Sequence, residues 1–216
     1  MKKTAIILAG GEGRRMKSEI PKQFLLLKKK PVLIHTLEKF SEFDKIIVVL
    51  PKSQIKYWET LCLKYKCSIN HSIVKGGETR FDSVKNGIHN IIENSIVMIH
   101  DGVRPLVSKK TINTLIENLS VGYGVVPVIS IKDSIRKIEG TLSTSINRKN
   151  MFKVLTPQCF LGNEIKDAYS QKFSESFTDD ACVFEKNGGK IKTIIGEKIN
   201  MKITIKEDLE IIKSLM

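Results

Sequence analysis

Short apolar runs rich in isoleucine and valine alternate with amphipathic stretches along most of this chain of 216 residues. The apolar runs predict buried strands, because a strand covered on both faces is apolar along its whole length. The amphipathic stretches between them predict helices. The predicted strands are 4–8, 45–50, 96–100 and 124–128, and the predicted helices are 31–40, 54–64, 80–92 and 109–118. This alternation favours a Rossmann-like α/β fold, with a mostly parallel sheet flanked by helices on both faces.

Residues 131–151 interrupt the alternation. They are polar, and two short β-like pieces flank Glu139-Gly140, so this segment is predicted to be a protruding β-hairpin arm. Beyond the arm we expect helices at 162–172 and 179–187, a strand at 190–195, and a last helix that begins with a capping box at 204–207. Residues 1–216 are therefore expected to form one domain with the arm as its appendage. Side-chain caps are expected from Ser53, Thr79, Ser108 and Thr178.

The chain carries a formal net charge of +13, which suits nucleic acid, a membrane surface or small polyanions as partners. No apolar run approaches the roughly 20 residues that cross a bilayer, so no membrane is expected. The apolar run near the start is too short for a signal peptide, and we interpret it as the first strand. The four cysteines show no metal-ligand spacing. These features favour a cytoplasmic protein with reduced thiols.

A glycine-rich loop follows the first strand: residues 8–16 read Leu-Ala-Gly-Gly-Glu-Gly-Arg-Arg-Met. Glycines let the backbone approach a ligand closely and turn several N–H groups into one concavity. Arg15 and Lys22, which follows Pro21, add a guanidinium and an ammonium group, as a triphosphate requires. A dinucleotide-dependent oxidoreductase is disfavoured, because Met16 replaces the third small residue of that fingerprint and no acidic residue ends the second strand.

Further motifs extend this pattern along the chain. They are Gly76-Gly77-Glu78-x-Arg80-x-Asp82-Ser83-Val84, His100-Asp101-Gly102-x-Arg104-Pro105, Thr156-Pro157-Gln158, Thr178-Asp179-Asp180-Ala181 and Asn200-x-Lys202-Ile203-Thr204. Together with the glycine loop and Pro21-Lys22-Gln23, they give residues 4–210 a resemblance to the 2-C-methyl-D-erythritol 4-phosphate cytidylyltransferase family of sugar-phosphate nucleotidyltransferases. The resemblance implies transfer of CMP from CTP to the alditol phosphate with release of pyrophosphate, a step of non-mevalonate isoprenoid biosynthesis. It also implies Mg²⁺ as cofactor and a homodimer with shared active sites.

The resemblance also implies a role for each matching residue. CTP is expected to be bound by Ala9, Gly10, Gly11, Gly13, Ser83 and Asp101. Catalytic charge is expected from Arg15, Lys22, Lys202 and the partner chain's copy of Arg148. The acceptor is expected to be bound by Arg104, Ser134, Arg148, Thr156 and Thr178. Asp101 is expected to face either Mg²⁺ or the ribose of CTP, and Asp180 receives no role.

Two alternatives remain open from the sequence. A cytidylyltransferase for another alditol phosphate, such as ribitol 5-phosphate, would share the glycine loop and two of the motifs, but the arm segment 147–150 favours methylerythritol phosphate. A basic nucleic-acid-binding module would explain the net charge. The chain lacks the basic helix, stacking aromatic motif or zinc spacing of such modules, so we expect no nucleic acid as partner. The positive charge would instead speed the arrival of phosphorylated substrates.

Overall fold

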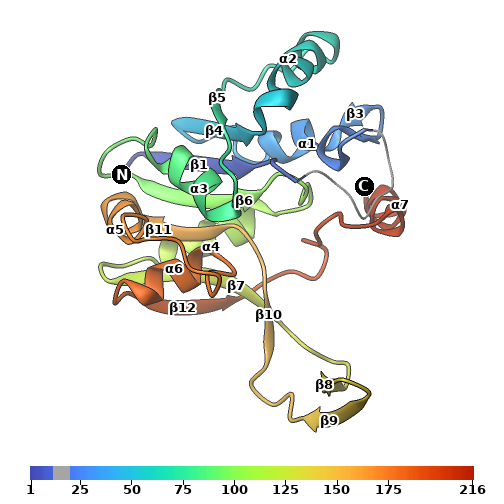
Figure 1. The fold of residues 1–216 in the computed structure, drawn as a ribbon. Helices are drawn as coiled ribbons and strands as arrows, with labels where there is room; N and C mark the ends of the chain where they lie inside the picture. Colours follow the sequence, from blue (N-terminus) through green and yellow to red (C-terminus); the bar gives the residue numbers. More distant parts are fainter. Residues whose placement is uncertain (12–19) are drawn as a thin grey trace.

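A computed structural model describes residues 1–11 and 20–216. Its centre is an eight-stranded sheet, and the strands along one half of that sheet run parallel (Figure 1). These parallel strands are β1 (Lys3–Leu8), β4 (Lys45–Leu50), β5 (Ser72–Lys75) and β6 (Ile96–Asp101). β1 lies between β4 and β6, and Leu8 is opposite both Val49 and Asp101. The predicted mostly parallel sheet is confirmed, although β5 was not predicted.

The other half of the sheet contains two antiparallel strands, β10 (Phe152–Val154) and β11 (Gln158–Leu161). Its other members are β7 (Tyr123–Ser130) and β12 (Lys190–Ile195). β11 lies between β6 and β7 and runs antiparallel to both, whereas β12 runs parallel to β7. β10 pairs antiparallel with the end of β7, and a cis peptide bond between Thr156 and Pro157 separates β10 from β11. The chain therefore returns along β10 and enters β11 beside the carboxyl end of β6, at Gln158 opposite Ile99.

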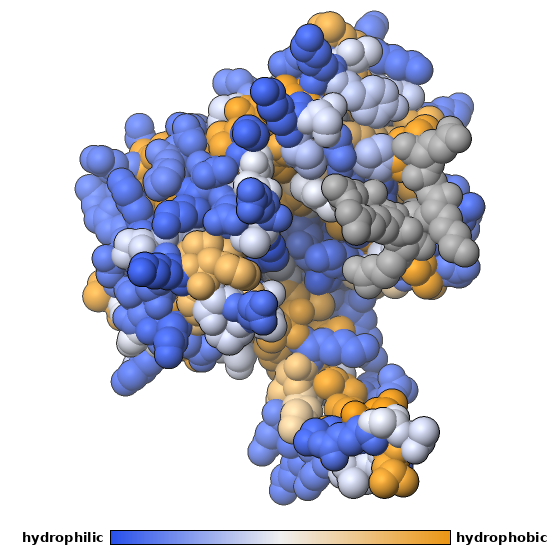
Figure 2. Space-filling model, viewed as in Figure 1, coloured by the Kyte–Doolittle hydropathy of each residue, from blue (hydrophilic) through white to orange (hydrophobic). Residues whose placement is uncertain are grey.

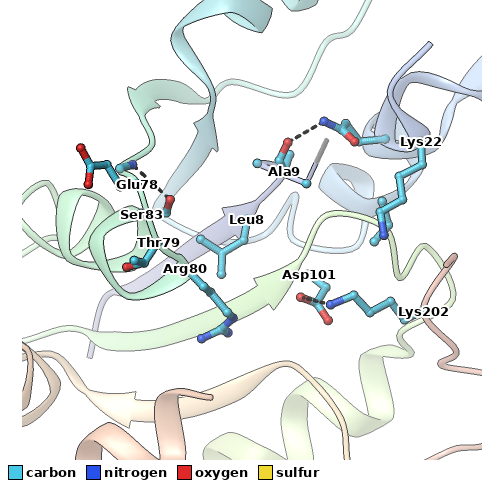
Figure 3. Close-up of a pocket in the computed structure, with 14 residues that line it drawn as sticks. Leu8, Ala9, Lys22, Glu78, Thr79, Arg80, Ser83, Asp101 and Lys202 are labelled. Atoms are coloured by element: carbon cyan, nitrogen blue, oxygen red, sulfur yellow. Dashed lines mark hydrogen bonds and ion pairs between the residues drawn. The ribbon is translucent and has the colours of Figure 1, made fainter. Parts of the chain in front are cut away.

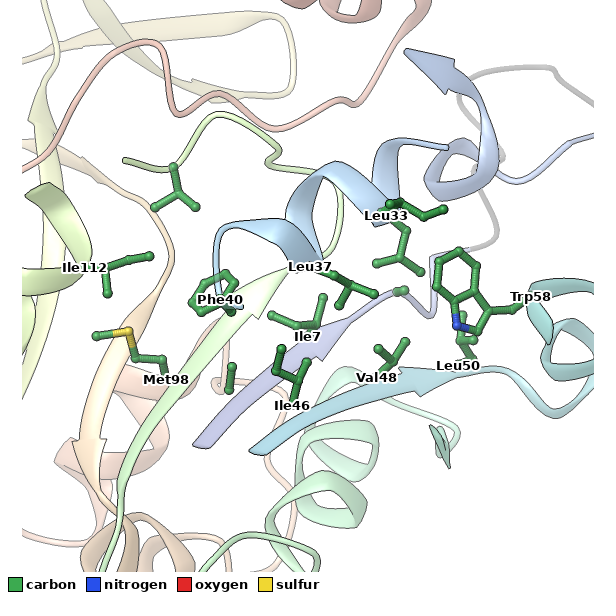
Figure 4. Close-up of a cluster of buried hydrophobic side chains, with 14 of the residues drawn as sticks. Ile7, Leu33, Leu37, Phe40, Ile46, Val48, Leu50, Trp58, Met98 and Ile112 are labelled. Carbon is green, nitrogen blue, oxygen red and sulfur yellow. The ribbon is translucent and has the colours of Figure 1, made fainter. Parts of the chain in front are cut away.

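Helices cover both faces of the sheet. α1 (Val32–Glu38), α2 (Ile55–Lys64) and α4 (Lys109–Glu117) contribute to one apolar cluster. It includes Leu37, Trp58 and Ile112 of the helices together with strand residues such as Ile7, Val48 and Met98 (Figure 4). α3 (Arg80–Ile88), α5 (Gly162–Ala168) and α6 (Asp180–Lys186) contribute to a second cluster, over neighbouring strand residues such as Ile6. Alternate residues of a strand point to opposite faces, which explains why each strand needs an uninterrupted apolar run.

A smaller group of elements completes the fold beside α1. The 3-10 helix η2 (Lys22–Phe24) and the short strands β2 (Leu26–Leu27) and β3 (Lys30–Pro31) precede α1, and α7 (Lys206–Leu215) packs against them. Leu27, Val32, Ile203 and Ile212 form the small apolar cluster that joins these segments. None of the described helices is long and apolar enough to cross a membrane.

The arm was predicted and is present as a two-stranded sheet of its own. β8 (Ile135–Glu139) and β9 (Leu142–Ile146) pair antiparallel and project away from the main sheet (Figure 1). Gly140 has φ +62° in the turn between them, a conformation that glycine adopts at little cost. The segments that carry the arm leave β7 and return into β10, so its base lies at the same edge of the sheet as the end of β7.

Several predicted helix ends were wrong. α3 ends at Ile88 rather than 92, because the backbone then turns, with Asn90 N–H bonded to the Gly87 carbonyl. Ser53 is no cap, since it lies inside the 3-10 helix η3 (Lys52–Gln54) that precedes α2. Thr79 and Ser108 do cap α3 and α4 as predicted.

The N-terminal caps of the last two helices, α6 (Asp180–Lys186) and α7 (Lys206–Leu215), also differ from the prediction. Asp179, not Thr178, caps α6, and its carboxylate accepts from Cys182 N–H at 3.0 Å. Before α7, the carboxylate of Asp208 accepts from the backbone of Thr204 and Ile205, at 2.7 and 3.0 Å. A carboxylate binds exposed backbone N–H groups more strongly than a neutral hydroxyl does, which accounts for both changes.

Candidate active site

A pocket of about 280 Å³ lies where β1 and β6 end and α3 begins (Figure 3). Carboxyl ends of neighbouring parallel strands share one edge of a sheet, so the loops that follow them meet there. The lining residues are Leu8, Ala9, Gly10, Gly11, Lys22, Gln23, Gly77, Glu78, Thr79, Arg80, Ser83, Asp101, Val103 and Lys202. The pocket thus unites residues from the glycine loop, the start of α3, the end of β6 and the segment before α7.

The wall formed by α3 is rigid and polar. Thr79 caps the helix by accepting from Asp82 N–H, and the Asp82 carboxylate accepts from Thr79 N–H at 3.1 Å. The Ser83 hydroxyl accepts from Gly77 N–H at 3.1 Å, which leaves its own proton for a ligand. A side chain at Gly77 would collide with Asp82, since its Cβ would lie 2.2 Å from the Asp82 Cβ. This wall therefore offers a ligand a hydroxyl held in place by a hydrogen bond and a closely approaching backbone.

The glycine loop is tied to the segment that carries Lys22. Gln23 donates from Nε2 to the Ala9 carbonyl and to Gln54 Oε1, both at 2.7 Å. Pro21 precedes η2 and holds an extended conformation, so Lys22 enters the pocket from a constrained backbone. Lys22 is largely buried and lines the pocket beside Gly11. Two residues predicted for this loop, Gly13 and Arg15, lie outside the described residues.

Asp101 is the buried carboxylate at the tip of β6. Its Oδ2 accepts from Arg104 Nε at 2.9 Å, and its Oδ1 accepts from Lys202 Nζ at 3.1 Å. Burial alone would raise the pKa of Asp101, but the charges of Lys202, Arg104 and Arg80 hold it well below its usual range. The carboxylate is therefore ionised, and it is surrounded by the positive charges of Lys202, Arg104 and Arg80, which come from three parts of the chain.

Behind Asp101, a buried histidine and threonine fix the end of the strand. The Thr156 hydroxyl accepts from Asp101 N–H at 3.1 Å and bonds to His100 Nδ1 at 2.9 Å. His100 Nε2 lies 3.1 Å from the Arg104 carbonyl, which can only accept, so Nε2 carries the proton and Nδ1 accepts from Thr156. Burial lowers the pKa of His100 to about 4, so the ring is neutral at physiological pH.

Asn200 joins the Lys202 segment to this network. Its carbonyl accepts from Arg104 Nη1 at 2.9 Å, and its side-chain Nδ2 donates to the Thr156 carbonyl at 2.8 Å. Ile203 N–H donates to the Val103 carbonyl at 3.0 Å. Lys202 therefore reaches Asp101 from a segment whose backbone is held by Asn200 on one side and by Ile203 on the other. The spacing of Asn200 in the sequence did not indicate this role.

The structure brings together only part of the predicted site. Ala9, Gly10, Gly11, Ser83, Asp101, Lys22 and Lys202 all line the pocket. Arg104 and Thr156 are buried behind it, bonded to Asp101, and are not among its lining residues. Thr178 contacts Cys182 Sγ at 3.3 Å rather than capping α6. Ser134 and Arg148 are exposed on the arm segment, where Arg148 donates to the Lys132 carbonyl.

A pair that sequence reasoning did not assign also belongs to the site. Arg80, the first residue of α3, lines the pocket, and its guanidinium bonds to the buried carboxylate of Asp180. The two residues are 100 positions apart, so no local spacing could have paired them. Arg80 and Asp180 each lie in a motif that the sequence analysis identified, but those motifs did not indicate that the two side chains bond to each other.

The acidic residues of the pocket bear on metal binding. Glu78 and Asp101 are the acidic side chains among the described lining residues, and both Asp101 oxygens already accept from cations. Within residues 1–11 and 20–216, no three His, Cys, Asp or Glu side chains gather as a metal site. This donor set fits Mg²⁺ only in the form in which phosphates of a substrate supply most of the ligands.

Comparison with known proteins gives a consistent result over the whole chain. The family model for 2-C-methyl-D-erythritol 4-phosphate cytidylyltransferase matches residues 3–216. Proteins of that name from Azobacteroides pseudotrichonymphae and Bacteroides fragilis are 46% and 43% identical, over 99% and 100% of this chain and 98% and 100% of their own lengths. The crystal structure of the Francisella tularensis protein of that name superposes with a TM-score of 0.84 at 29% identity, over the full length of both chains.

His100 predicts a specific dependence of stability on pH. The folded pKa of about 4 lies below the ordinary value of 6.5, so the unfolded chain takes up the proton first as the pH falls. The contribution of His100 to the free energy of unfolding is therefore constant above about pH 7 and decreases as the pH falls from about 6.5 to 4. From pH 7.5 to pH 5 we expect a loss of about 2 kcal/mol that His100→Gln does not show. Urea unfolding of both proteins at the two pH values measures this difference, and equal losses would contradict the buried neutral ring.

Proposed function

The chain belongs to the 2-C-methyl-D-erythritol 4-phosphate cytidylyltransferase family, and we propose that the pocket at the ends of β1 and β6 is where it joins CMP from CTP to the alditol phosphate. The protein is a nucleotidyltransferase, and the reaction releases pyrophosphate and supplies isoprenoid biosynthesis. The ribitol phosphate and nucleic-acid alternatives are not favoured by its relatives. The observation that carries the proposal is the convergence of Lys22, Lys202 and Arg80 on one small pocket beside a glycine loop.

The chemistry is an in-line attack by a phosphate oxygen of the acceptor on the α-phosphorus of CTP. A phosphate monoester dianion is already a nucleophile, so no general base is needed. This agrees with His100, which is neutral and buried behind Asp101 rather than lining the pocket. What the reaction requires is alignment of two anions and stabilisation of the charge that develops on the phosphoryl oxygens and the leaving group.

On the nucleotide side, the α3 wall and the glycine loop have complementary tasks. The Ser83 hydroxyl and the backbone near Gly77 would hydrogen-bond the edge of cytosine, since neither brings a charge to a neutral base. The backbone of Ala9, Gly10 and Gly11 would approach the phosphates, with Lys22 beside it. Arg15 is proposed as a second cation of this loop.

Where the acceptor meets the nucleotide, Lys202 would lie at the α-phosphate of CTP. Its ammonium group is held by Asp101, and a phosphate oxygen can share it because an ammonium carries three donors. Arg104 and Thr156 would act by fixing Asp101 and, with Thr178, are proposed at the acceptor end. Arg148 and Ser134 of the arm are proposed to complete the acceptor site of a partner chain.

Nucleotidyltransferases generally use divalent cations, and we propose Mg²⁺ here. Asp101 would be its protein ligand, with the CTP phosphates supplying most of the others. The ion would neutralise charge on the triphosphate. The two cations bonded to Asp101 already balance that carboxylate, so the protein contributes little net negative charge to hold a metal by itself.

The arm supports a dimeric form of the enzyme. Ile138 and Leu142 are 72% and 77% exposed, and Phe152 at the base of the arm is 44% exposed. Figure 2 shows apolar residues gathered on the arm, below a mostly hydrophilic body. A two-stranded hairpin is marginally stable by itself, so packing against a second copy would stabilise it.

The acceptor is tested by pyrophosphate release from CTP and Mg²⁺ with 2-C-methyl-D-erythritol 4-phosphate, ribitol 5-phosphate and other alditol phosphates. We expect the first to give the highest kcat/KM, and UTP to replace CTP poorly. A higher kcat/KM with ribitol 5-phosphate would reject the proposed acceptor.

Lys22→Ala should lower kcat on the order of 10³-fold, because a cation beside the transferred phosphoryl group is removed. A loss of kcat below about tenfold would show that Lys22 does not act in the chemical step.

The shared site is tested by mixing two inactive variants, Lys22→Ala and Arg148→Ala. With free subunit exchange, about half of the dimers are heterodimers, and each has one site with both defects and one with neither. About a quarter of the wild-type activity should therefore return. As a control, Arg136→Ala changes another arginine of the arm, one that bonds to Ser143 within it, and should be active alone.

If Arg148 served the site of its own chain, every site in the mixture would keep one defect. Activity would then remain at the average of the two separate variants, and the shared-site proposal would be wrong.

A further inference from the structure

Arg80 is fixed at the wall of the pocket by a buried carboxylate. Its Nη1 and Nη2 donate to the two oxygens of Asp180, at 2.8 and 2.6 Å. Asp180 is fully buried at the start of α6, and its Oδ1 also accepts from the Tyr169 hydroxyl at 2.6 Å. Burial and the neighbouring Asp180 raise the pKa of Tyr169, so the hydroxyl keeps its proton and remains a donor. This bidentate pair gives the guanidinium one orientation.

The pair leaves part of the guanidinium facing the pocket. A guanidinium has five N–H donors, and Asp180 uses two of them. The other three have no partner among the described residues, and the Arg80 side chain is 35% exposed. Figure 3 shows it extending from the start of α3 towards the side of the pocket where Asp101 and Lys202 lie, away from the glycine loop at Ala9.

The other arginine of this region is arranged differently. Arg104 is buried and does not line the pocket. Its guanidinium donates hydrogen bonds to Asp101 and to the Asn200 carbonyl. Among the described residues, the guanidinium that a bound molecule would meet in this pocket is therefore that of Arg80. Because Asp180 balances its charge, Arg80 offers oriented hydrogen-bond donors more than net positive charge.

We propose that Arg80 is a further substrate-binding residue, which donates hydrogen bonds to the hydroxyl groups of the sugar-alcohol acceptor, with Asp180 and Tyr169 as its positioning residues. This rests on the proposed function of the pocket. Oriented donors with balanced charge suit neutral hydroxyls, whereas the triphosphate is better met by Lys22 and the loop backbone. The bond to Asp180 also holds the guanidinium towards the side of the pocket where Asp101 and Lys202 lie (Figure 3), and the acceptor is proposed to bind on that side.

The decisive variant changes both members of the pair, Arg80→Gln with Asp180→Asn. Removing only Arg80 would leave a buried carboxylate without its partner and would damage the fold, whereas removing both charges avoids that. We expect the KM for the alditol phosphate to rise about tenfold or more, and the KM for CTP to stay within about threefold. The melting temperature should stay within about 4 °C of the wild type. Asp180→Asn alone keeps Arg80 but loosens it, and should raise the acceptor KM by a smaller factor.

The matched control is Lys30→Gln with Glu38→Gln, which removes an ion pair that is not part of the pocket and should change neither KM. A folded Arg80–Asp180 double variant with a normal acceptor KM would overturn the proposal, and so would an equal rise in the KM for CTP. If that double variant does not fold, Arg80→Lys is the alternative test, because lysine keeps a positive charge opposite Asp180 but lacks the paired N–H donors of the guanidinium. A raised KM for the acceptor in this variant would support the proposal, and an unchanged KM would reject it. A wild type that releases no pyrophosphate with any alditol phosphate would instead reject the proposed function.

Discussion

A carboxylate buried at the end of a central strand must be compensated, and Asp101 imposes this requirement on the rest of the site. Leaving such a charge unpaired costs several kcal/mol, so the fold has to deliver cations to it. Arg104 comes from the turn after β6, and Lys202 comes from a segment about 100 residues further along the chain. Of these two cations, Lys202 also lines the pocket, where a phosphorylated substrate needs positive charge, whereas Arg104 stays buried. Lys202 therefore serves both the compensation of Asp101 and the pocket.

The pocket repeats this arrangement on its second side. Asp180, buried at the start of α6, holds Arg80 as Asp101 holds Lys202, so two buried carboxylates orient the cations that face the ligand. His100 and Thr156 keep the end of β6 in place without adding charge, because the ring is neutral and both of its nitrogens are bonded. Preorganised groups of this kind need no rearrangement when charge develops in the transition state. The sheet supplies the geometry, and the buried ion pairs supply the orientation.

The sequence predicted those parts of the fold that depend on local pattern. β1, β4, β6, β7 and the arm follow from apolar runs and from a polar interruption, and the glycine loop and Lys22 follow from their closeness in the chain. β11 was missed because four residues beside a proline carry no period of their own. Arg104, which was predicted to bind the acceptor, is buried against Asp101 behind the pocket, and Arg80, which lines the pocket, was given no role. Both outcomes depend on which distant carboxylate each arginine meets, and that is a property of the tertiary structure.

The most direct measurement of this account is a double-mutant cycle on kcat/KM with Asp101→Asn and Lys202→Met. If Asp101 acts mainly by holding Lys202, each single variant should lose on the order of a hundredfold in kcat/KM, and the double variant should be little worse than the poorer single one. Circular dichroism and urea unfolding would establish that all three variants are folded. If the two losses multiply in the folded double variant, the residues act independently, and the claim that Asp101 organises the cations of the pocket is contradicted.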